Sequence, residues 1–255
     1  MAIARIKPHG GIHFDSELPG DKSISHRAAM IAALAERETT LSNFSTGGDC
    51  LSTLSCLQQL GIEIRREAGS VSVAGNGLYG LKKPDAPLDC GNSGTTARLL
   101  AGILTGQDFD STLIGDPSLS RRPMQRILGP LEQMGAHLVS NDGVLPIEIS
   151  GRKLKPIEYS LVVPSAQVKS CLLFAGLFAG GKTVIRESMP SRDHTERLLS
   201  AVTKEKRKDE TLLSVIGGQG ISSRDMTIPG DISSAAFLIA AALLSLPVVL
   251  YHDTI

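Results

Sequence analysis

The 255-residue chain has no tryptophan, and only 4% of its residues are aromatic. It also has no net charge, because 26 Lys and Arg residues balance 26 Asp and Glu residues. A nucleic-acid-binding surface usually needs an excess of positive charge or aromatic side chains on which bases stack. An anionic membrane surface likewise attracts basic segments. The composition therefore argues against nucleic acid and membranes as partners, and the length allows one large domain or two small ones.

Cysteine is scarce, and no cysteine has the spacing of a metal site. The four residues are Cys50, Cys56, Cys90 and Cys171. They form no CxxC pair and no Cys/His ligand pattern, so we expect reduced, partly buried thiols and no metal. The segment Met1 to His13 lacks an apolar core of signal-peptide length. These features together predict a cytoplasmic protein.

One uncharged run, Ile232 to Tyr251, is long enough to span a bilayer. Pro247 interrupts this run, and residues 248–251 have the composition of a strand. Asp231 and Ser233 are typical N-terminal caps of a helix. A buried helix followed by a strand is therefore the better interpretation, and a membrane-spanning helix is the alternative.

A tight turn followed by an apolar helix rich in Ala and Leu occurs four times. The copies begin at Pro19, Cys90, Pro164 and Pro229. Their spacing is roughly 70 residues, and a period of this length indicates that a whole supersecondary unit has been duplicated. Residues 57–64 and 131–138 form a second repeated pair, in which a helix ends at Gly61 or Gly135 and a strand follows.

Short runs rich in Ile, Val and Leu predict strands between these helices. The runs are Val71–Ala74, Leu113–Ile114, Pro146–Ile149, Leu161–Val163 and Thr183–Arg186. The charged residues 204–210 predict a solvated loop. The alternation of helices and strands predicts an α/β (α+β) fold of repeated βαβαββ units, with the apolar helices covered by sheets.

Residues 176–183, GLFAGGKT, fit the P-loop pattern letter for letter. A phosphate-binding P-loop follows a strand and opens a helix. Here residues 165–178 predict a helix before the motif, and residues 183–186 predict a strand after it. We therefore interpret the motif as a helix-to-strand turn and not as a nucleotide site.

The adjacent pair Asp193-His194 suggests a catalytic dyad, but neighbouring residues seldom hold the geometry of a base and its orienting group. We favour a helix N-terminus, with Ser191 or Asp193 as the cap and Glu196 completing a capping box. Arg192 is different, because an arginine beside a helix start can reach a bound anion.

The polar residues at the repeated turns are the candidates for chemistry. They are Lys22, Ser23 and Arg27 in the first turn, Asn92, Ser93, Gly94, Thr95 and Arg98 in the second, Ser165, Gln167 and Lys169 in the third, and Arg121 and Arg122 in the loop 115–123. A helix N-terminus with added cations and hydroxyls suits a phosphate dianion. Repeats related by rotation would bring these turns to one positive cleft. The alternatives are simple helix caps and solvated surface charges.

Several segments together resemble the 5-enolpyruvylshikimate-3-phosphate synthase family. They are PGDKSISHRA, LDCGNSGTTARLL, GDPSLSRRPM, SAQVKS, SRDHTER and PGDISSAAF, in the family's order and spacing over essentially the whole chain. The sequences SAQ and SRDHTE resemble those of the class II branch, which is often glyphosate-tolerant. The related UDP-N-acetylglucosamine enolpyruvyl transferases share the fold but lack the pattern of residues 22–27.

The resemblance implies a transferase of the shikimate pathway, which makes aromatic amino acids. It would be a 3-phosphoshikimate 1-carboxyvinyltransferase, moving the enolpyruvyl group of phosphoenolpyruvate to the 5-hydroxyl of shikimate 3-phosphate. No metal or organic cofactor is implied, and glyphosate is implied as a further ligand. In the family, an Ala at the Gly94 position is linked to glyphosate resistance, whereas this chain has Gly.

The resemblance also implies binding residues. On the shikimate 3-phosphate side they are Lys22, Ser23, Arg27, Ser165, Ala166, Gln167 and Arg192. On the phosphoenolpyruvate side they are Lys22, Gly94, Arg122 and Gln167, with Asn92 and Thr95 shaping the loop beside Gly94. Lys22 is the catalytic residue that this chain would carry.

Family members have two lobes of three units each, arranged as an inside-out α/β barrel. The resemblance therefore implies that residues 20–228 form one complete lobe, and that residues 1–19 and 229–255 are a remnant of the second. The family's acid–base segments have no counterpart in this sequence. Two functions follow as expectations. Either the chain is the N-terminal half of the enzyme and contributes to turnover with its second half, or it is a non-catalytic half-protein that binds shikimate 3-phosphate and needs a complementary C-terminal half for turnover. The apolar remnant is expected to pack on the complete lobe, to self-associate or to recruit that complementary half.

Overall fold

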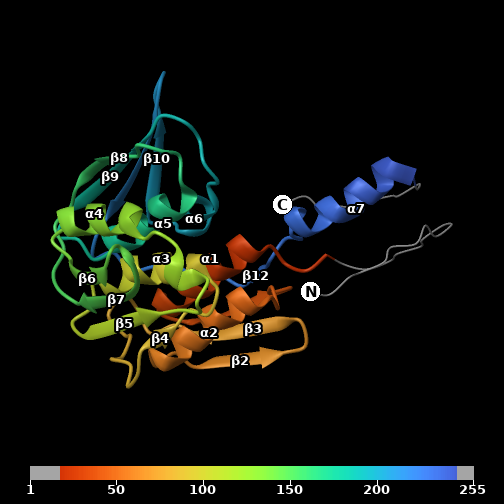
Figure 1. The fold of residues 1–255 in the computed structure, drawn as a ribbon, viewed down its shortest axis with the longest axis horizontal. Helices are drawn as coiled ribbons and strands as arrows, with labels where there is room; N and C mark the ends of the chain where they lie inside the picture. Colours follow the sequence, from red (N-terminus) through yellow and green to blue (C-terminus); the bar gives the residue numbers. More distant parts are fainter. Residues whose placement is uncertain (1–17, 246–255) are drawn as a thin grey trace.

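The computed structural model describes residues 18–245 of the protein, with side chains to residue 240. The expectations for residues 1–17 and for the strand at 248–251 lie outside the described residues. Within residues 18–245, three four-stranded sheets surround a group of buried helices (Figure 1). The central helices are α1 (Lys22–Leu34), α3 (Gly94–Leu104) and α5 (Ala166–Gly176), and α7 (Ile232–Ser245) is the fourth copy. The repeated turn-and-helix pattern therefore predicted these four helices correctly.

Each unit adds a second helix beside its sheet. These helices are α2 (Gly48–Gln59), α4 (Gln125–Gln133) and α6 (His194–Leu198), and a short 3-10 helix, η1 (Leu119–Arg121), precedes α4. The helices α2 and α4 are followed by Gly61 and Gly135, with φ of 85° and 86°. Glycine accepts this left-handed conformation without steric cost, so it can end a helix just before a strand, as the sequence pattern predicted.

The three sheets have one topology. Read from the parallel edge, the first has the order β12-β1-β3-β2, the second β4-β5-β7-β6 and the third β8-β9-β11-β10. Their bounds are β1 (Glu38–Ser42), β2 (Ile64–Glu67), β3 (Ser70–Ala74) and β12 (Met226–Thr227); β4 (Leu88–Asp89), β5 (Asp110–Ile114), β6 (His137–Asn141) and β7 (Val144–Ser150); and β8 (Glu158–Ser160), β9 (Lys182–Glu187), β10 (Val202–Lys206) and β11 (Thr211–Ile216).

The leading strand of each sheet pairs in parallel with the next one, and the other pairings are antiparallel. In the first sheet this leading place is filled by β12, whose residues Met226 and Thr227 pair with Leu41 and Ser42. The chain thus returns to its beginning after three units. The three units are therefore closed against one another by a strand from far along the sequence.

Two local predictions were wrong. Residues Leu161–Val163 are not a strand, because β8 ends at Ser160 and Val162 is 89% exposed where the chain turns toward α5. The charged residues 204–210 are not one loop, since Lys204–Lys206 belong to β10. This strand lies at the edge of its sheet, where charged side chains prevent pairing with another chain.

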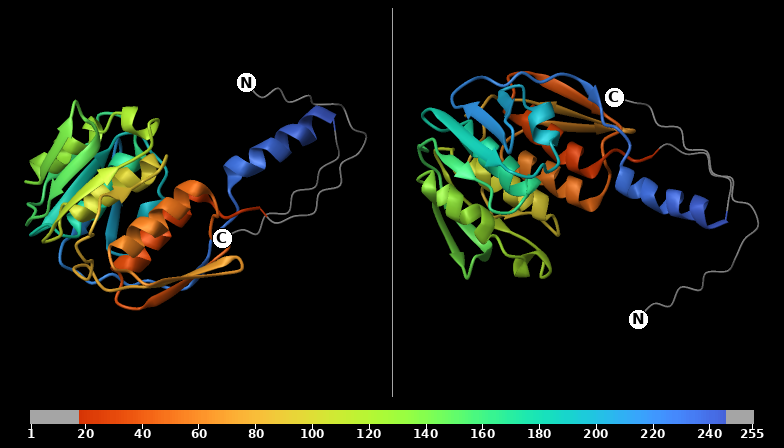
Figure 2. Two further views of the ribbon diagram at one scale, coloured as in Figure 1. Left: turned by 60° about the horizontal axis from the view of Figure 1, so that its bottom comes forward. Right: turned by 90° about the horizontal axis from the view of Figure 1, so that it is seen from above.

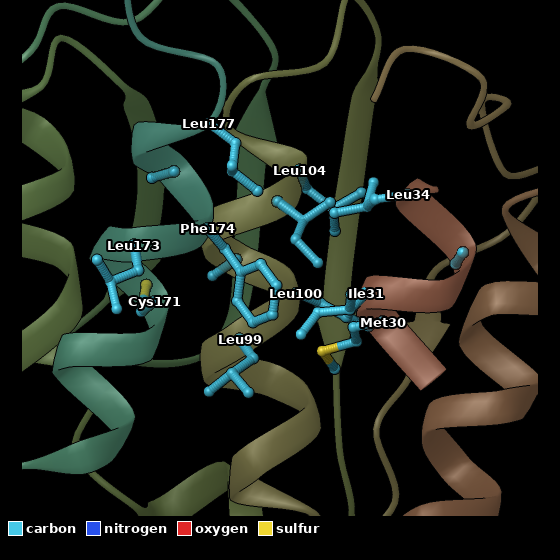
Figure 3. Packing of buried hydrophobic residues seen from close by; sticks show 14 of the residues in the cluster. Met30, Ile31, Leu34, Leu99, Leu100, Leu104, Cys171, Leu173, Phe174 and Leu177 are labelled. Carbon is cyan, nitrogen blue, oxygen red and sulfur yellow. The ribbon is translucent and has the colours of Figure 1, made fainter. Parts of the chain in front are cut away.

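The hydrophobic core lies between the central helices. Met30 of α1 lies beside Leu100 of α3 and Leu34 lies beside Leu104, while Phe174 of α5 packs against α3 from its own helix (Figure 3). At Gly102 of α3, an added Cβ would lie 2.3 Å from a carbonyl oxygen of α5. Only glycine allows these two helix backbones to approach so closely.

The four cysteines are unpaired and buried. Burial raises the pKa of the Cys50 thiol to about 11 and that of the Cys171 thiol to about 12, so both stay protonated at neutral pH. The motif at residues 176–183 is the predicted helix-to-strand turn, because α5 ends at Gly176 and β9 begins at Lys182.

Helix α7 projects away from the three sheets in each view (Figure 1, Figure 2). Ile232 is 60% exposed and Phe237 is 81% exposed, so the prediction of a buried helix here is wrong for the side chains described, residues 232–240. Among residues 18–245, no helix combines the length and the apolar character that crossing a membrane requires.

Candidate functional site

A cavity of about 610 Å³ lies where the N-terminal turns of the repeated helices meet. It is lined by Asp21, Lys22, Ser23, Arg27, Thr95, Ser165, Ala166, Gln167, Ser191, Arg192, Asp231 and Ser233. These residues come from the starts of α1, α3, α5 and α7 and from the loop before α6. All four copies of the repeated turn therefore contribute to one polar cavity.

The start of α1 supplies a helix cap and a lysine. The Asp21 carboxylate accepts a hydrogen bond of 2.8 Å from the backbone N–H of Ile24, which caps the helix. The Lys22 ammonium forms an ion pair with Asp49 and remains 50% exposed. Its backbone N–H donates to the Asp231 carboxylate at 3.3 Å. The helix start therefore holds Lys22 at the cavity, with its ammonium open to solvent.

Arg27 is a buried cation at the wall of the cavity, with only 2% of its surface exposed. Its Nε donates to the Thr195 hydroxyl at 2.7 Å, and its Nη2 donates to the Ser170 hydroxyl at 2.8 Å. Its Nη1 donates to the hydroxyl of Ser23 at 2.8 Å. Burial lowers the pKa of the guanidinium to about 10, although the charge of Glu196 opposes this shift. Arg27 therefore stays charged at neutral pH and ties α1 to α5 and α6.

Ser23 also lies against His194, whose Nδ1 is 3.1 Å from the Ser23 hydroxyl oxygen. Burial is the main reason why the pKa of His194 is lowered, so this imidazole is neutral near pH 7. Our sequence interpretation treated His194 only as part of a helix start. Its contact with Ser23 was missed because the two residues are far apart in the chain.

The predicted capping box at α6 is wrong. Asp193 precedes the helix but makes no side-chain capping bond. Ser191 instead donates from its backbone N–H to Glu187, at 2.9 Å. The Glu196 side chain is only 4% exposed and pairs with Lys169. Glu196, the acidic residue of the predicted capping box, therefore forms a buried ion pair and does not cap α6.

A second cationic cluster adjoins the cavity. Arg122 donates from Nη2 to the Asn92 side chain at 2.5 Å. A Cβ added at Gly94 would lie 2.6 Å from Nη1 of Arg98 and 3.6 Å from Nη1 of Arg122. The absence of a side chain at Gly94 thus leaves room for two guanidinium groups at the start of α3. Asn92, Gly94 and Arg122 do not line the cavity, in contrast to the other predicted binding residues.

Gln167 connects this cluster to the cavity. Arg98 donates from Nη1 to the Gln167 carbonyl oxygen at 2.9 Å, and the Gln167 amide nitrogen donates to the Thr95 hydroxyl at 3.1 Å. Burial lowers the pKa of Arg98, and repulsion from the charge of Arg122 lowers it further. Two positive regions therefore meet at one amide side chain.

Three residues of the predicted constellation have other roles. Lys169 is fully buried and forms ion pairs with two carboxylates, so it is neither at the cavity nor on the surface. Arg121 is exposed and donates from Nε to the carbonyl oxygen of Pro117 at 2.9 Å. Ser93 accepts a hydrogen bond from the backbone N–H of Thr96 at 3.1 Å, which makes it the cap of α3.

The sequence interpretation also missed four residues that line the cavity. They are Asp21, Ser191, Asp231 and Ser233. A signal was present in the tripeptide Pro-Gly-Asp, which occurs at residues 19–21 and again at 229–231. The two copies pair at Gly20 and Gly230, so the start of α7 lies beside the start of α1. Among residues 18–245, no group of His, Cys, Asp or Glu side chains has the arrangement of a metal site.

Comparison with known proteins gives consistent matches. The family model of EPSP synthase (3-phosphoshikimate 1-carboxyvinyltransferase) matches residues 10–253. The 3-phosphoshikimate 1-carboxyvinyltransferase of Solibacter usitatus is 52% identical over 241 residues, which cover 94% of this chain and 57% of that protein. The corresponding protein of Koribacter versatilis is 50% identical, over 96% of this chain and 57% of its own length.

The solved structures give the same result. A structure of EPSP synthase from Acinetobacter baumannii matches with a TM-score of 0.82 and 44% sequence identity. The match covers 89% of this chain and 52% of that chain. The chain therefore has the fold of this enzyme and spans about half the length of the relatives it matches.

Proposed function

We propose that this chain, which belongs to the EPSP synthase (3-phosphoshikimate 1-carboxyvinyltransferase) family of enzymes, forms the shikimate 3-phosphate side of that transferase's active site. The observation that carries the proposal is the meeting of four helix starts at one cavity with Lys22, Arg27 and Arg192 in its lining. Helix N-termini and cations together favour a phosphate dianion. Shikimate 3-phosphate carries such a dianion and a carboxylate as well.

Phosphoenolpyruvate is the second substrate of the proposal. The adjoining cluster of Gly94, Arg98 and Arg122 offers two guanidinium groups for its phosphate and carboxylate. Gln167 lies between this cluster and the cavity, where it can contact both substrates. Glyphosate, as a small anion, would compete at the same cluster.

The proposed reaction needs positioning and proton transfer. The 5-hydroxyl oxygen of shikimate 3-phosphate bonds to C2 of phosphoenolpyruvate, the hydroxyl loses its proton, and C3 gains a proton. The tetrahedral adduct then loses a proton from C3 and releases inorganic phosphate. Holding both anions side by side removes much of the entropic barrier to the first step. We assign this holding to the present residues, with Lys22 as the cation that reaches both substrates.

The lobe boundaries are part of the proposal. The pairing of β12 with β1 closes three units, which supports one complete lobe at residues 20–228. The projection of α7 away from this lobe supports assigning residues 1–19 and 229–255 to the second lobe (Figure 2). We propose that the remaining length of the relatives, absent from this chain, supplies the acid–base groups. A complementary C-terminal half would then be the partner needed for turnover.

Calorimetric titration of the chain with shikimate 3-phosphate tests the proposal. We expect the binding to weaken as salt is added, because salt screens the attraction between the cavity cations and the phosphate. Shikimate, which lacks the phosphate, should bind more weakly than its 3-phosphate. Arg192→Ala should weaken the binding of shikimate 3-phosphate, whereas Arg121→Ala removes an exposed arginine outside the cavity and should not. Equal affinities for shikimate and its 3-phosphate would contradict the proposal.

Release of inorganic phosphate from the two substrates tests whether this chain supplies binding and a C-terminal half supplies the acid–base groups. We expect none from this chain alone and turnover after a complementary C-terminal half is added. The alternative, a non-catalytic half-protein, predicts that the chain alone binds shikimate 3-phosphate weakly and releases no phosphate. Turnover by the chain alone would show that the acid–base groups are already present in it.

A further inference from the structure

A buried lysine joins two carboxylates directly behind the cavity. Lys169 of α5 has no exposed surface, and its Nζ lies 3.1 and 3.2 Å from the two carboxylate oxygens of Glu187. The same Nζ lies 2.7 Å from a carboxylate oxygen of Glu196. Both carboxylates are at most 5% exposed. Even when paired, buried charges seldom stabilise a protein more than apolar residues of similar volume would, which points to a role beyond stability.

The two carboxylates differ in what else they hold. One oxygen of Glu187 also accepts hydrogen bonds from Ser191, at 2.9 Å from the backbone N–H and 2.5 Å from the hydroxyl. Within the described residues, the Glu196 oxygens accept no hydrogen bond and only form the ion pair. Glu187 therefore links the buried lysine by hydrogen bonds to Ser191, whereas Glu196 links it to α6 by an ion pair alone.

That chain carries two residues of the cavity wall. Ser191 and Arg192 line the cavity, and they lie in the stretch 188–193, which is neither helix nor strand. Such a stretch has no backbone ladder to fix its position, so side-chain hydrogen bonds must do so. Bonds to an ionised acceptor are stronger than neutral ones, and Lys169 keeps this acceptor in place.

We propose that Glu187 is a positioning residue of the cavity: Lys169 fixes its carboxylate, and the carboxylate fixes Ser191 and with it Arg192. The two residues that anchor this arrangement belong to rigid elements, since Lys169 is in α5 and Glu187 is the last residue of β9. The consequence for ligand affinity rests on the proposed function, in which Arg192 contacts shikimate 3-phosphate. The positional role itself does not depend on the ligand.

A matched pair of variants tests this proposal. Glu187→Met and Glu196→Met each remove one buried carboxylate and each leave Lys169 with one partner. Hydrogen exchange of the backbone amides of residues 188–193 measures how firmly this loop is held. Calorimetry with shikimate 3-phosphate measures the effect of each variant on ligand binding. We expect Glu187→Met to reduce exchange protection and affinity about tenfold each, because two bonds to a charged acceptor are lost. Glu196→Met should change both by less than about twofold.

A conservative variant separates the hydrogen bonds from the charge. Glu187→Gln keeps a carbonyl oxygen that can accept from Ser191, so it should recover most of the protection that Glu187→Met loses. If Glu187→Met does not fold, Ser191→Ala keeps all three buried charges and removes only the hydroxyl bond. Partial loss of protection over residues 188–193 is then the expected result.

Equal loss of protection in Glu187→Met and Glu196→Met would overturn the proposal, because a general effect of charge would then explain both. Unchanged protection in Glu187→Met or in Ser191→Ala would overturn it as well. If the unaltered chain does not bind shikimate 3-phosphate, the proposed function fails. The exchange results then still decide the role of Glu187.

Discussion

His26 should make the stability of the protein depend strongly on pH. This residue of α1 has no exposed surface, and its Nδ1 lies 2.6 Å from the Thr53 hydroxyl oxygen. Burial, followed by the charge of Lys22, lowers its pKa from 6.5 to about 3, while Asp49 acts in the opposite direction and Arg27 lowers it slightly further. His26 is therefore neutral in the folded protein at every pH above about 3.

The direction of the effect follows from proton binding. Below pH 6.5 the unfolded chain binds a proton at His26 and the folded protein does not, so acid favours unfolding. Stability is fully present above pH 6.5 and is lost as the pH falls toward 3. Between pH 7 and pH 5 the loss from this residue is about 2 kcal/mol, since each pH unit below the unfolded pKa costs about 1.4 kcal/mol. A folded pKa of 4 instead of 3 would barely change this figure.

Urea unfolding of the protein and of His26→Gln at pH 7, 6 and 5 measures this contribution. The glutamine is neutral at each pH and can still hydrogen-bond to Thr53, so the variant should lose about 2 kcal/mol less than the wild type. Other titrating groups are common to both proteins and cancel in the difference. His137→Gln, the same substitution at an exposed position on β6, is the matched control for the change of residue type. Parallel pH profiles for the wild type and His26→Gln would refute the reasoning.

Three further predictions concern the cavity and its support. Lys22→Met should weaken shikimate 3-phosphate binding at least about tenfold by calorimetry, because a charged donor is lost; unchanged affinity would mean that Lys22 serves only the helix start. Gly94→Ala should change the free energy of unfolding in urea by less than about 1 kcal/mol, since the Arg98 side chain can move away. It should weaken phosphoenolpyruvate binding, and an unaltered titration would show that Arg98 is not needed in its present position. Lys169→Met should lower the free energy of unfolding by about 3–5 kcal/mol, because two buried carboxylates lose their counter-charge; a loss below about 1 kcal/mol would contradict a buried ion cluster.

The repeated helices could be predicted from the sequence because their signal is local. A turn residue, a cap and an apolar run lie within about twenty positions of one another, and the same pattern recurs. The repetition also carried the expectation that the helix starts meet, since units of one topology present the same end to a common centre. The structure places Lys22, Thr95 and Gln167 at one cavity accordingly.

The roles that could not be predicted depend on contacts between distant parts of the chain. Lys169 lies just after the third turn in the sequence, and as a cation at that place it resembles a residue of an anion-binding cavity. Its partners, Glu187 and Glu196, come from β9 and α6, and only folding brings them together. Nothing within a helical turn of Lys169 distinguishes a buried ion cluster from a binding site. The same applies to β12, which has two residues and is defined only by its pairing with β1.

Two carboxylates in the lining raise the question of how the cavity can attract an anion. The Asp21 carboxylate accepts the backbone N–H of Ile24, and the Asp231 carboxylate accepts the backbone N–H groups of Lys22 and Ser233. Both negative charges therefore lie at helix starts, where the helix dipole and the unpaired N–H groups offset them.

Of the three cations in the lining, Lys22 is paired with Asp49, whereas Arg27 and Arg192 are not offset by a carboxylate in this way. Arg27 donates its hydrogen bonds to neutral oxygens, and within residues 18–245 the Arg192 guanidinium makes no ion pair. Positive charge therefore dominates the cavity, even though the residues that line it include nearly as many acidic as basic side chains. Asp231→Asn should consequently change anion affinity less than Arg192→Ala does. A calorimetric comparison in which Asp231→Asn has the larger effect would show that the helix starts do not neutralise these carboxylates.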